Sequence, residues 1–151
     1  MRFALDSNFI LYCEGMHQDW RNKIALDLIA AMGGMPVIVS HQVLGETLNV
    51  MLRKMKLPKS LALAKISDWR DDYFVQETNA SVFEEGSEIL GQHNFQVWDA
   101  IVLAAASVSG ASYLLSEDMQ DGFRWRNTEI VNPFAKIPHP IIPALLNKME
   151  E

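Results

Sequence analysis

The chain has 151 residues, a length that fits one ordinary domain with a single buried core. Apolar residues make up 49% and charged residues 21% of the chain, which indicates a folded globular protein and excludes an intrinsically disordered one. The formal net charge of −6 argues against a generally basic protein that coats nucleic acid, although it leaves room for a local basic surface.

The sequence lacks the patterns of membrane and disulfide-bonded proteins. Its longest apolar run is shorter than the roughly 18 residues that indicate a membrane span. The first residues lead directly into a strand pattern, without the apolar region of a signal peptide. A single cysteine, Cys13, excludes a disulfide framework and a thiolate metal site. We therefore expect a cytoplasmic protein without membrane contact.

Apolar patterns predict strands that alternate with helices along the chain. The expected strands are residues 2–5, 36–39, 112–115 and 129–131, with 73–76 as a weaker candidate. The expected helices are residues 8–14 with Ser7 as N-cap, 19–32, one from Ser40 to about Met55, one from Leu57-Pro58, 81–92, one from near Asp99 to Gly110, and a short one at 143–149. This alternation specifies an α/β sandwich with a central, mostly parallel sheet of four to five strands flanked by helices.

Four acids occupy equivalent places in this pattern. Asp6 follows the first strand and Asp118 the fourth, and Glu46 and Asp99 are expected in the first turns of helices entered from the same end of the sheet. Functional groups gather beyond the carboxyl ends of parallel strands, so we expect the four carboxylates to converge. Such a cluster repels itself unless it shares a metal or a proton, and oxygen ligands favour Mg²⁺ or Mn²⁺ over zinc. For Asp99 alone, a simpler interpretation is an acid that meets the positive end of the helix dipole.

Two stretches are candidates for contact with nucleic acid. Residues 53–59 pack four positive charges into seven residues, although an ordinary solvated helix end explains them equally well. Residues 123–126 interleave aromatic side chains with cations, as proteins that bind single strands do, and a solvated hairpin is the alternative. The candidate RNA-binding residues are Arg53, Lys54, Lys56, Arg124 and Arg126.

The chain also resembles a known family. The stretches ALDSNFILY, HQVLGETLNV, VWDAIVLAAA and LLSEDMQDG, followed by IVNPF, are similar in content and order to the motifs of the PIN domain, especially of bacterial VapC-type toxin ribonucleases. The resemblance covers residues 1 to about 134. It implies a PIN-like three-layer sandwich as a nuclease domain over residues 1–134, and it leaves residues 135–151 as a proline-rich C-terminal tail packed on or extending from that domain.

The resemblance further implies an activity and its residues. The activity is Mg²⁺- or Mn²⁺-dependent hydrolysis of RNA phosphodiester bonds by an endoribonuclease, the toxin of a type II toxin–antitoxin system, with RNA as substrate, a cognate antitoxin as partner and a homodimer as assembly. The alternative is an orphan or non-catalytic PIN-like module that binds RNA or protein. The implied residues are Asp6, Glu46, Asp99 and Asp118 as metal-binding and catalytic acids, with Asn8, Ser116 and Asp121 in supporting places.

Overall fold

The structure is a computed structural model that describes residues 1–150. Its strands form one sheet and its helices surround that sheet. The strands are β1 (Phe3–Leu5), β2 (Val37–Ser40), β3 (Phe74–Gln76), β4 (Tyr113–Leu115), β5 (Arg124–Trp125) and β6 (Thr128–Val131). The helices are α1 (Ser7–Cys13), α2 (Trp20–Ala31), α3 (His41–Arg53), α4 (Lys59–Asp72), α5 (Ala80–Gln92), α6 (Val97–Val108) and α7 (Ile141–Asn147).

The sheet has the strand order β3-β2-β1-β4-β6-β5. All neighbouring strands pair in parallel, except that β5 runs antiparallel to β6. The chain therefore fills the sheet outward from β1 on one side, through β2 and β3, and then returns to the other side of β1 with β4. The expected mostly parallel α/β sheet is confirmed. It has six strands rather than four to five, because β5, with only two residues, is too short to produce a periodic pattern.

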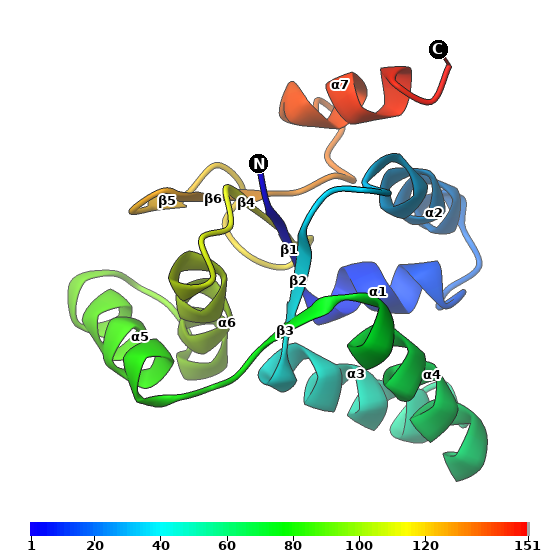
Figure 1. Cartoon of the computed structure of the whole chain (residues 1–151), viewed down its shortest axis with the longest axis horizontal. Coiled ribbons are helices and arrows are strands. Elements are labelled where there is room, and N and C mark those ends of the chain that lie inside the picture. Colours follow the sequence, from blue (N-terminus) through cyan, green and yellow to red (C-terminus); the bar gives the residue numbers. More distant parts are fainter. Residues whose placement is uncertain (151) are drawn as a thin grey trace.

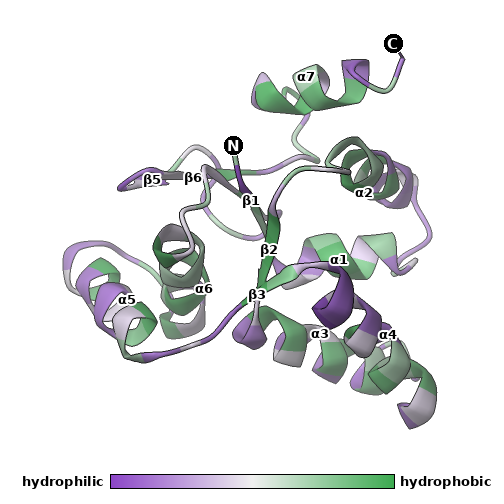
Figure 2. Cartoon of the chain, in the orientation of Figure 1, coloured by the Kyte–Doolittle hydropathy of each residue, from purple (hydrophilic) through white to green (hydrophobic). Residues whose placement is uncertain are grey.

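Helices cover both faces of the sheet. In Figure 1, α5 and α6 lie on one side of the strands and α1, α2, α3 and α4 lie on the other. Helix α6 is buried at every residue from Ala100 to Ala106, as its apolar sequence predicts. Figure 2 shows hydrophobic residues along β1 and β2 and hydrophilic residues on the outer parts of α5. The three-layer sandwich is thus held by one main core on both faces of the sheet.

One local expectation was wrong. The N-cap of α1 is Asp6, whose side chain accepts a hydrogen bond from the Ser7 backbone N–H, so Ser7 is already the first helical residue. Trp20, the first residue of α2, is 59% exposed, and its ring lies edge-on to that of Phe134. On α5, Phe83 is 63% exposed, and the buried face of the helix is formed by Val82, Glu85, Gly86 and Ile89.

The last part of the chain packs against the sandwich. Helix α7 begins at Ile141, two residues before the expected start, and its residues Ile142 and Leu145 are buried. In Figure 1 this helix lies beside α2. Within residues 1–150, no helix combines the length and the apolar character needed to cross a membrane.

Candidate active site

The candidate site lies between β1 and β4, where the order in which the chain adds strands to the sheet reverses. Strands β1 and β4 are neighbours at the centre of the sheet, and successive strands spread from them to opposite edges. At such a point the connections after the two strands diverge and leave a crevice beyond their carboxyl ends, where open α/β sheets bind ligands. Asp6 follows β1 directly and Ser116 follows β4 directly, so both side chains lie at this crevice.

Asp6 is the buried centre of the site. Its side chain caps α1 by accepting a hydrogen bond from the Ser7 N–H at Oδ1 (2.8 Å), and its Oδ2 accepts one from the Ser116 hydroxyl (2.6 Å). Burial raises the pKa of Asp6 to about 6, and repulsion from Glu46 and Asp99 adds to this increase, while the two hydrogen bonds oppose it. The fold therefore holds a carboxylate where its negative charge is costly.

Glu46 and Asp99 approach the site from two helices. Glu46, in the second turn of α3, accepts hydrogen bonds from the Ser7 hydroxyl (3.3 Å) and the Gln42 amide (2.7 Å). Asp99 is the third residue of α6. Partial burial raises the pKa of Asp99, and repulsion from Glu46 and Asp118 raises it further. These repulsions show that carboxylates from four separate elements interact.

Asp118 is exposed in the loop after β4, and Asn8 fixes it. The Asn8 side-chain nitrogen donates a hydrogen bond to Asp118 Oδ2 (3.1 Å), and the Asn8 side-chain oxygen accepts one from the Glu117 backbone N–H (3.2 Å). Only this orientation of the amide satisfies both neighbours, because a carboxylate can only accept and a backbone N–H can only donate. Asn8 thus clamps the loop that carries Asp118.

Asp6, Glu46 and Asp99 differ from the other buried and partly buried acids among residues 1–150 in having no cationic partner. Glu14, Glu85, Glu117 and Glu129 each form an ion pair with a lysine, arginine or histidine. In the described part of the chain, no ion pair reaches any of the acids of the candidate site, which are Asp6, Glu46, Asp99 and Asp118. No ion pair within residues 1–150 therefore balances the negative charge of these acids, and a bound cation would do so.

The donor set suits a hard divalent cation. All four side chains offer carboxylate oxygens, which Mg²⁺ and Mn²⁺ prefer, and no histidine or cysteine accompanies them. Considering residues 1–150 only, no three acidic, histidine or cysteine side chains are close enough together to enclose one ion as they stand. The residues present thus match an oxygen-liganded metal in the chemistry of their donor atoms and in having no ion pair within the described part of the chain.

Two cavities open beside the acids. One, of about 570 Å³, is lined by Ser7, Asn8 and Asp118 at the site and by Lys54 farther along α3. The other, of about 350 Å³, is lined by Asp99 and Asp118, among others. Asp118 borders both cavities. The two cavities thus offer space for a ligand on either side of the exposed acid.

The remaining candidate residues lie around the site rather than in it. Asp121 accepts a hydrogen bond from the Asn132 backbone N–H (2.8 Å) and so ties the loop after β4 to the segment after β6. Residues 123–126 form part of a β5–β6 hairpin, in which Arg124 pairs with Glu129. Arg126 pairs with Glu85 and Glu88 of α5. Of the basic side chains among residues 53–59, Lys54 borders the larger cavity, and Arg53 and Lys56 are exposed.

Ser7 and Gln42 hold Glu46, and neither was expected to do so. Gln42 stands four residues before Glu46 on the same helix, a spacing that places the two side chains together and that the sequence already displays. Ser7 was interpreted as a helix cap, and its hydroxyl contact with Glu46 of α3 depends on packing between α1 and α3.

Comparisons with known proteins identify the family and the fold. The PIN domain family model matches residues 3–124. A search of curated proteins gave no match. Among solved structures, VapC20 of Mycobacterium tuberculosis, described as a toxin that cleaves the sarcin–ricin loop, is 23% identical with a TM-score of 0.61, over 77% of this chain and 91% of that one.

Two further similar structures come from complexes described as VapBC bound to DNA. The one from Rickettsia felis is 15% identical with a TM-score of 0.65, over 86% of this chain and 97% of that one. The one from Salmonella typhimurium is 14% identical with a TM-score of 0.61, over 86% and 96%. These structural matches show a shared fold, and the family model matches most of the chain. The chain belongs to the PIN domain family.

Proposed function

We propose that this PIN domain is a Mg²⁺- or Mn²⁺-dependent endoribonuclease. The observation that supports the proposal is that Asp6, Glu46, Asp99 and Asp118 lie near enough to repel one another beyond the carboxyl ends of β1 and β4, and that none of them has an ion pair among residues 1–150. A purely structural set of acids would be expected to have protein cations beside it, as Glu85 and Glu117 do.

Each acid has a definite part in this proposal. The four carboxylates would hold the ion, which when bound supplies a Lewis acid for activating water and for stabilising charge on the phosphate. Ser116 and the Ser7 N–H keep Asp6 in one orientation, and Asn8 does the same for Asp118. Lys54, which lines the same cavity as Asp118, would contact a phosphate of the bound RNA strand.

We further propose that the enzyme is the toxin of a toxin–antitoxin pair and forms a homodimer. The support is the similarity of its fold to proteins described as VapBC complexes and to the toxin VapC20. A small DNA-binding protein encoded in the neighbouring reading frame would support this role, and its absence would favour an orphan nuclease. Light scattering of the purified protein would establish the number of subunits.

Metal dependence separates the enzyme from a PIN-like module that only binds RNA or protein. Mixed cellular RNA incubated with the protein should remain intact in chelator and be cleaved after addition of Mg²⁺ or Mn²⁺. Ca²⁺ should restore little cleavage, because its larger and looser coordination suits binding better than water activation. At a free metal concentration about 100 times Kd, binding should stabilise the fold by about 2.7 kcal/mol, which raises Tm by roughly 5–10 °C.

The variant Asp99→Asn tests the site itself. It should abolish cleavage and keep the fold, because it removes one of several repelling charges without changing the shape of the side chain. Asp27→Asn is the matched control, since Asp27 is an acid on α2 that pairs with Lys23 outside the site. Loss of the fold in Asp99→Asn would instead make Asp99 a structural helix-start acid. If metal neither stabilises the wild type nor supports cleavage, the binding-module alternative replaces the enzyme.

A further inference from the structure

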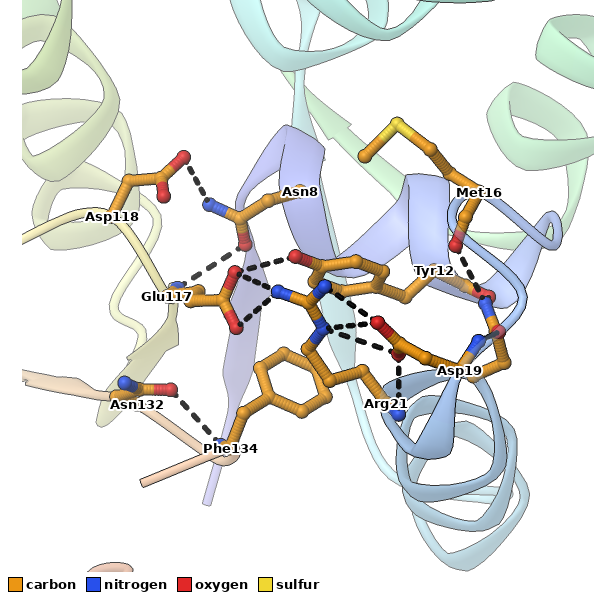
Figure 3. Close-up of polar contacts among 10 residues, drawn as sticks. Asn8, Tyr12, Met16, Asp19, Arg21, Glu117, Asp118, Asn132 and Phe134 are labelled. Carbon is orange, nitrogen blue, oxygen red and sulfur yellow. Dashed lines mark hydrogen bonds and ion pairs between the residues drawn. The ribbon is translucent and has the colours of Figure 1, made fainter. Parts of the chain in front are cut away.

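Glu117 is a fifth acid at the site that turns away from the other four. It directly precedes Asp118, and Figure 3 shows its side chain directed toward α1 and α2. There Glu117 Oε1 accepts hydrogen bonds from the Tyr12 hydroxyl and from Arg21 Nη1, the latter at 3.0 Å. Arg21 Nη1 also reaches Glu117 Oε2 (3.2 Å), so one guanidinium nitrogen spans the carboxylate. The side chain next to Asp118 is thus held by partners on two other elements.

Arg21 occupies an unusual place on its helix. It is the second residue of α2, where a positive charge faces the positive end of the helix dipole, an unfavourable arrangement. Two acids offset this, since Arg21 also pairs with Asp19 (Nη2 to Oδ2, 2.6 Å). Its guanidinium further packs over the Tyr12 ring, 4.6 Å from the centroid. Tertiary contacts, and not helix stability, therefore account for a cation at this position.

Hydrogen bonds of Asn22 hold the start of α2, which carries Arg21, in place. Asn22 donates hydrogen bonds to the carbonyl oxygens of Tyr12 (2.8 Å) and Met16 (2.9 Å), and its side-chain oxygen accepts one from the Asp19 N–H (2.7 Å). These contacts fasten the start of α2 to the end of α1. The backbone that carries Arg21 is consequently held in place, so the planar guanidinium keeps one orientation toward Glu117, as a directional hydrogen bond requires.

The contacts form one continuous path to the site. Arg21 and Tyr12 hold the Glu117 side chain, the Glu117 N–H donates to Asn8, and Asn8 donates to Asp118 (Figure 3). Ser116, at the other end of the same loop, donates to Asp6. Removing the Arg21 charge would leave Glu117 as a further uncompensated carboxylate beside Asp118, with the Tyr12 hydroxyl as its one remaining side-chain partner among residues 1–150.

We propose that Arg21 is a positioning residue of the metal site, which acts through Glu117 to hold the Ser116–Met119 loop so that Asp118 faces the other acids. This inference rests on the proposed metal-dependent function. Residues that orient metal ligands typically change metal affinity or activity by about 10–100-fold when they are removed. Arg21 is therefore expected to affect metal affinity although it cannot itself bind a cation.

The test is calorimetric titration of the metal-free protein with Mn²⁺, well below its melting temperature. Arg21→Gln should weaken Mn²⁺ binding by about tenfold or more, and Arg21→Lys, which keeps the charge but loses the fork, should weaken it less. The matched control is Lys65→Gln, because the Lys65–Glu14 pair is similarly buried and lies on α4 and the end of α1. That variant should bind Mn²⁺ as the wild type does, even if it melts earlier.

A double-mutant cycle shows whether Arg21 acts through Asp118. In an Asp118→Asn background, Arg21→Gln should change Mn²⁺ affinity by less than about twofold, because the ligand that it positions is gone. An equal loss in both backgrounds, or unchanged affinity in Arg21→Gln alone, overturns the inference while the proposed function stands. A wild type that binds no Mn²⁺ overturns both the inference and the metal dependence, so the two failures are distinguishable.

Discussion

The buried Asp6 carboxylate makes the stability of the metal-free protein depend on pH in an unusual direction. Its pKa is raised from 3.8 to about 6, so the folded protein holds this proton more tightly than the unfolded chain does. The stability that comes from the protonated form is complete below the unfolded pKa and is lost as pH rises through the folded pKa. Asp6 therefore lowers the free energy of unfolding between about pH 4 and about pH 6.

The magnitude follows from the same pKa difference. About two pKa units at about 1.4 kcal/mol each give a loss of about 3 kcal/mol above pH 6. Asp6 is only 5% exposed, so solvent screening does not reduce this figure substantially. The variant Asp6→Asn should avoid the loss, since its oxygen can still accept from the Ser7 N–H and its amide can donate to the Ser116 hydroxyl.

Urea denaturation of metal-free wild type and Asp6→Asn between about pH 4 and about pH 8 measures this difference. The two proteins should be similarly stable at the acidic end, and the variant should be more stable by about 3 kcal/mol at the alkaline end, equivalent to roughly 6–12 °C in Tm. Asp27→Asn, on an outer turn of α2, should follow the wild type. Parallel curves for wild type and Asp6→Asn would refute the claim that the site buries an uncompensated charge.

Two further predictions concern the basic side chains. Replacing Arg53, Lys54 and Lys56 with Gln should weaken RNA binding and make it less dependent on salt. In a fluorescence anisotropy titration, the slope of log K against log salt concentration should fall by about 0.7 for each phosphate that is no longer neutralised. An unchanged slope would make the segment an ordinary helix end. Arg126→Gln should destabilise the fold by about 1–3 kcal/mol in urea denaturation, because it leaves the Glu85 carboxylate, whose side chain is 8% exposed, without its cation. Weaker RNA binding with unchanged stability would instead identify Arg126 as a residue that binds substrate.

Local patterns in the sequence were sufficient to predict the layers and the places of the acids. Helix α6 is apolar on every side between Ala100 and Ala106, and a helix of that kind has to be buried. Asp6 comes directly after an apolar strand, and a parallel sheet collects such positions at one edge. These features depend on neighbours within a few residues, so periodicity alone was enough to place them.

The contacts that shape the site depend on residues far apart in the chain. Arg21 and Glu117 are separated by 96 positions, and Arg126 and Glu85 by 41, so no local pattern connects them. Whether Arg126 faces solvent or a buried acid is decided by the packing of the β5–β6 hairpin against α5, and the sequence displays only a cation beside a tryptophan. The missing counter-charge of Asp6 is likewise a property of the folded chain, because only packing decides which of 13 lysines and arginines come near which acids.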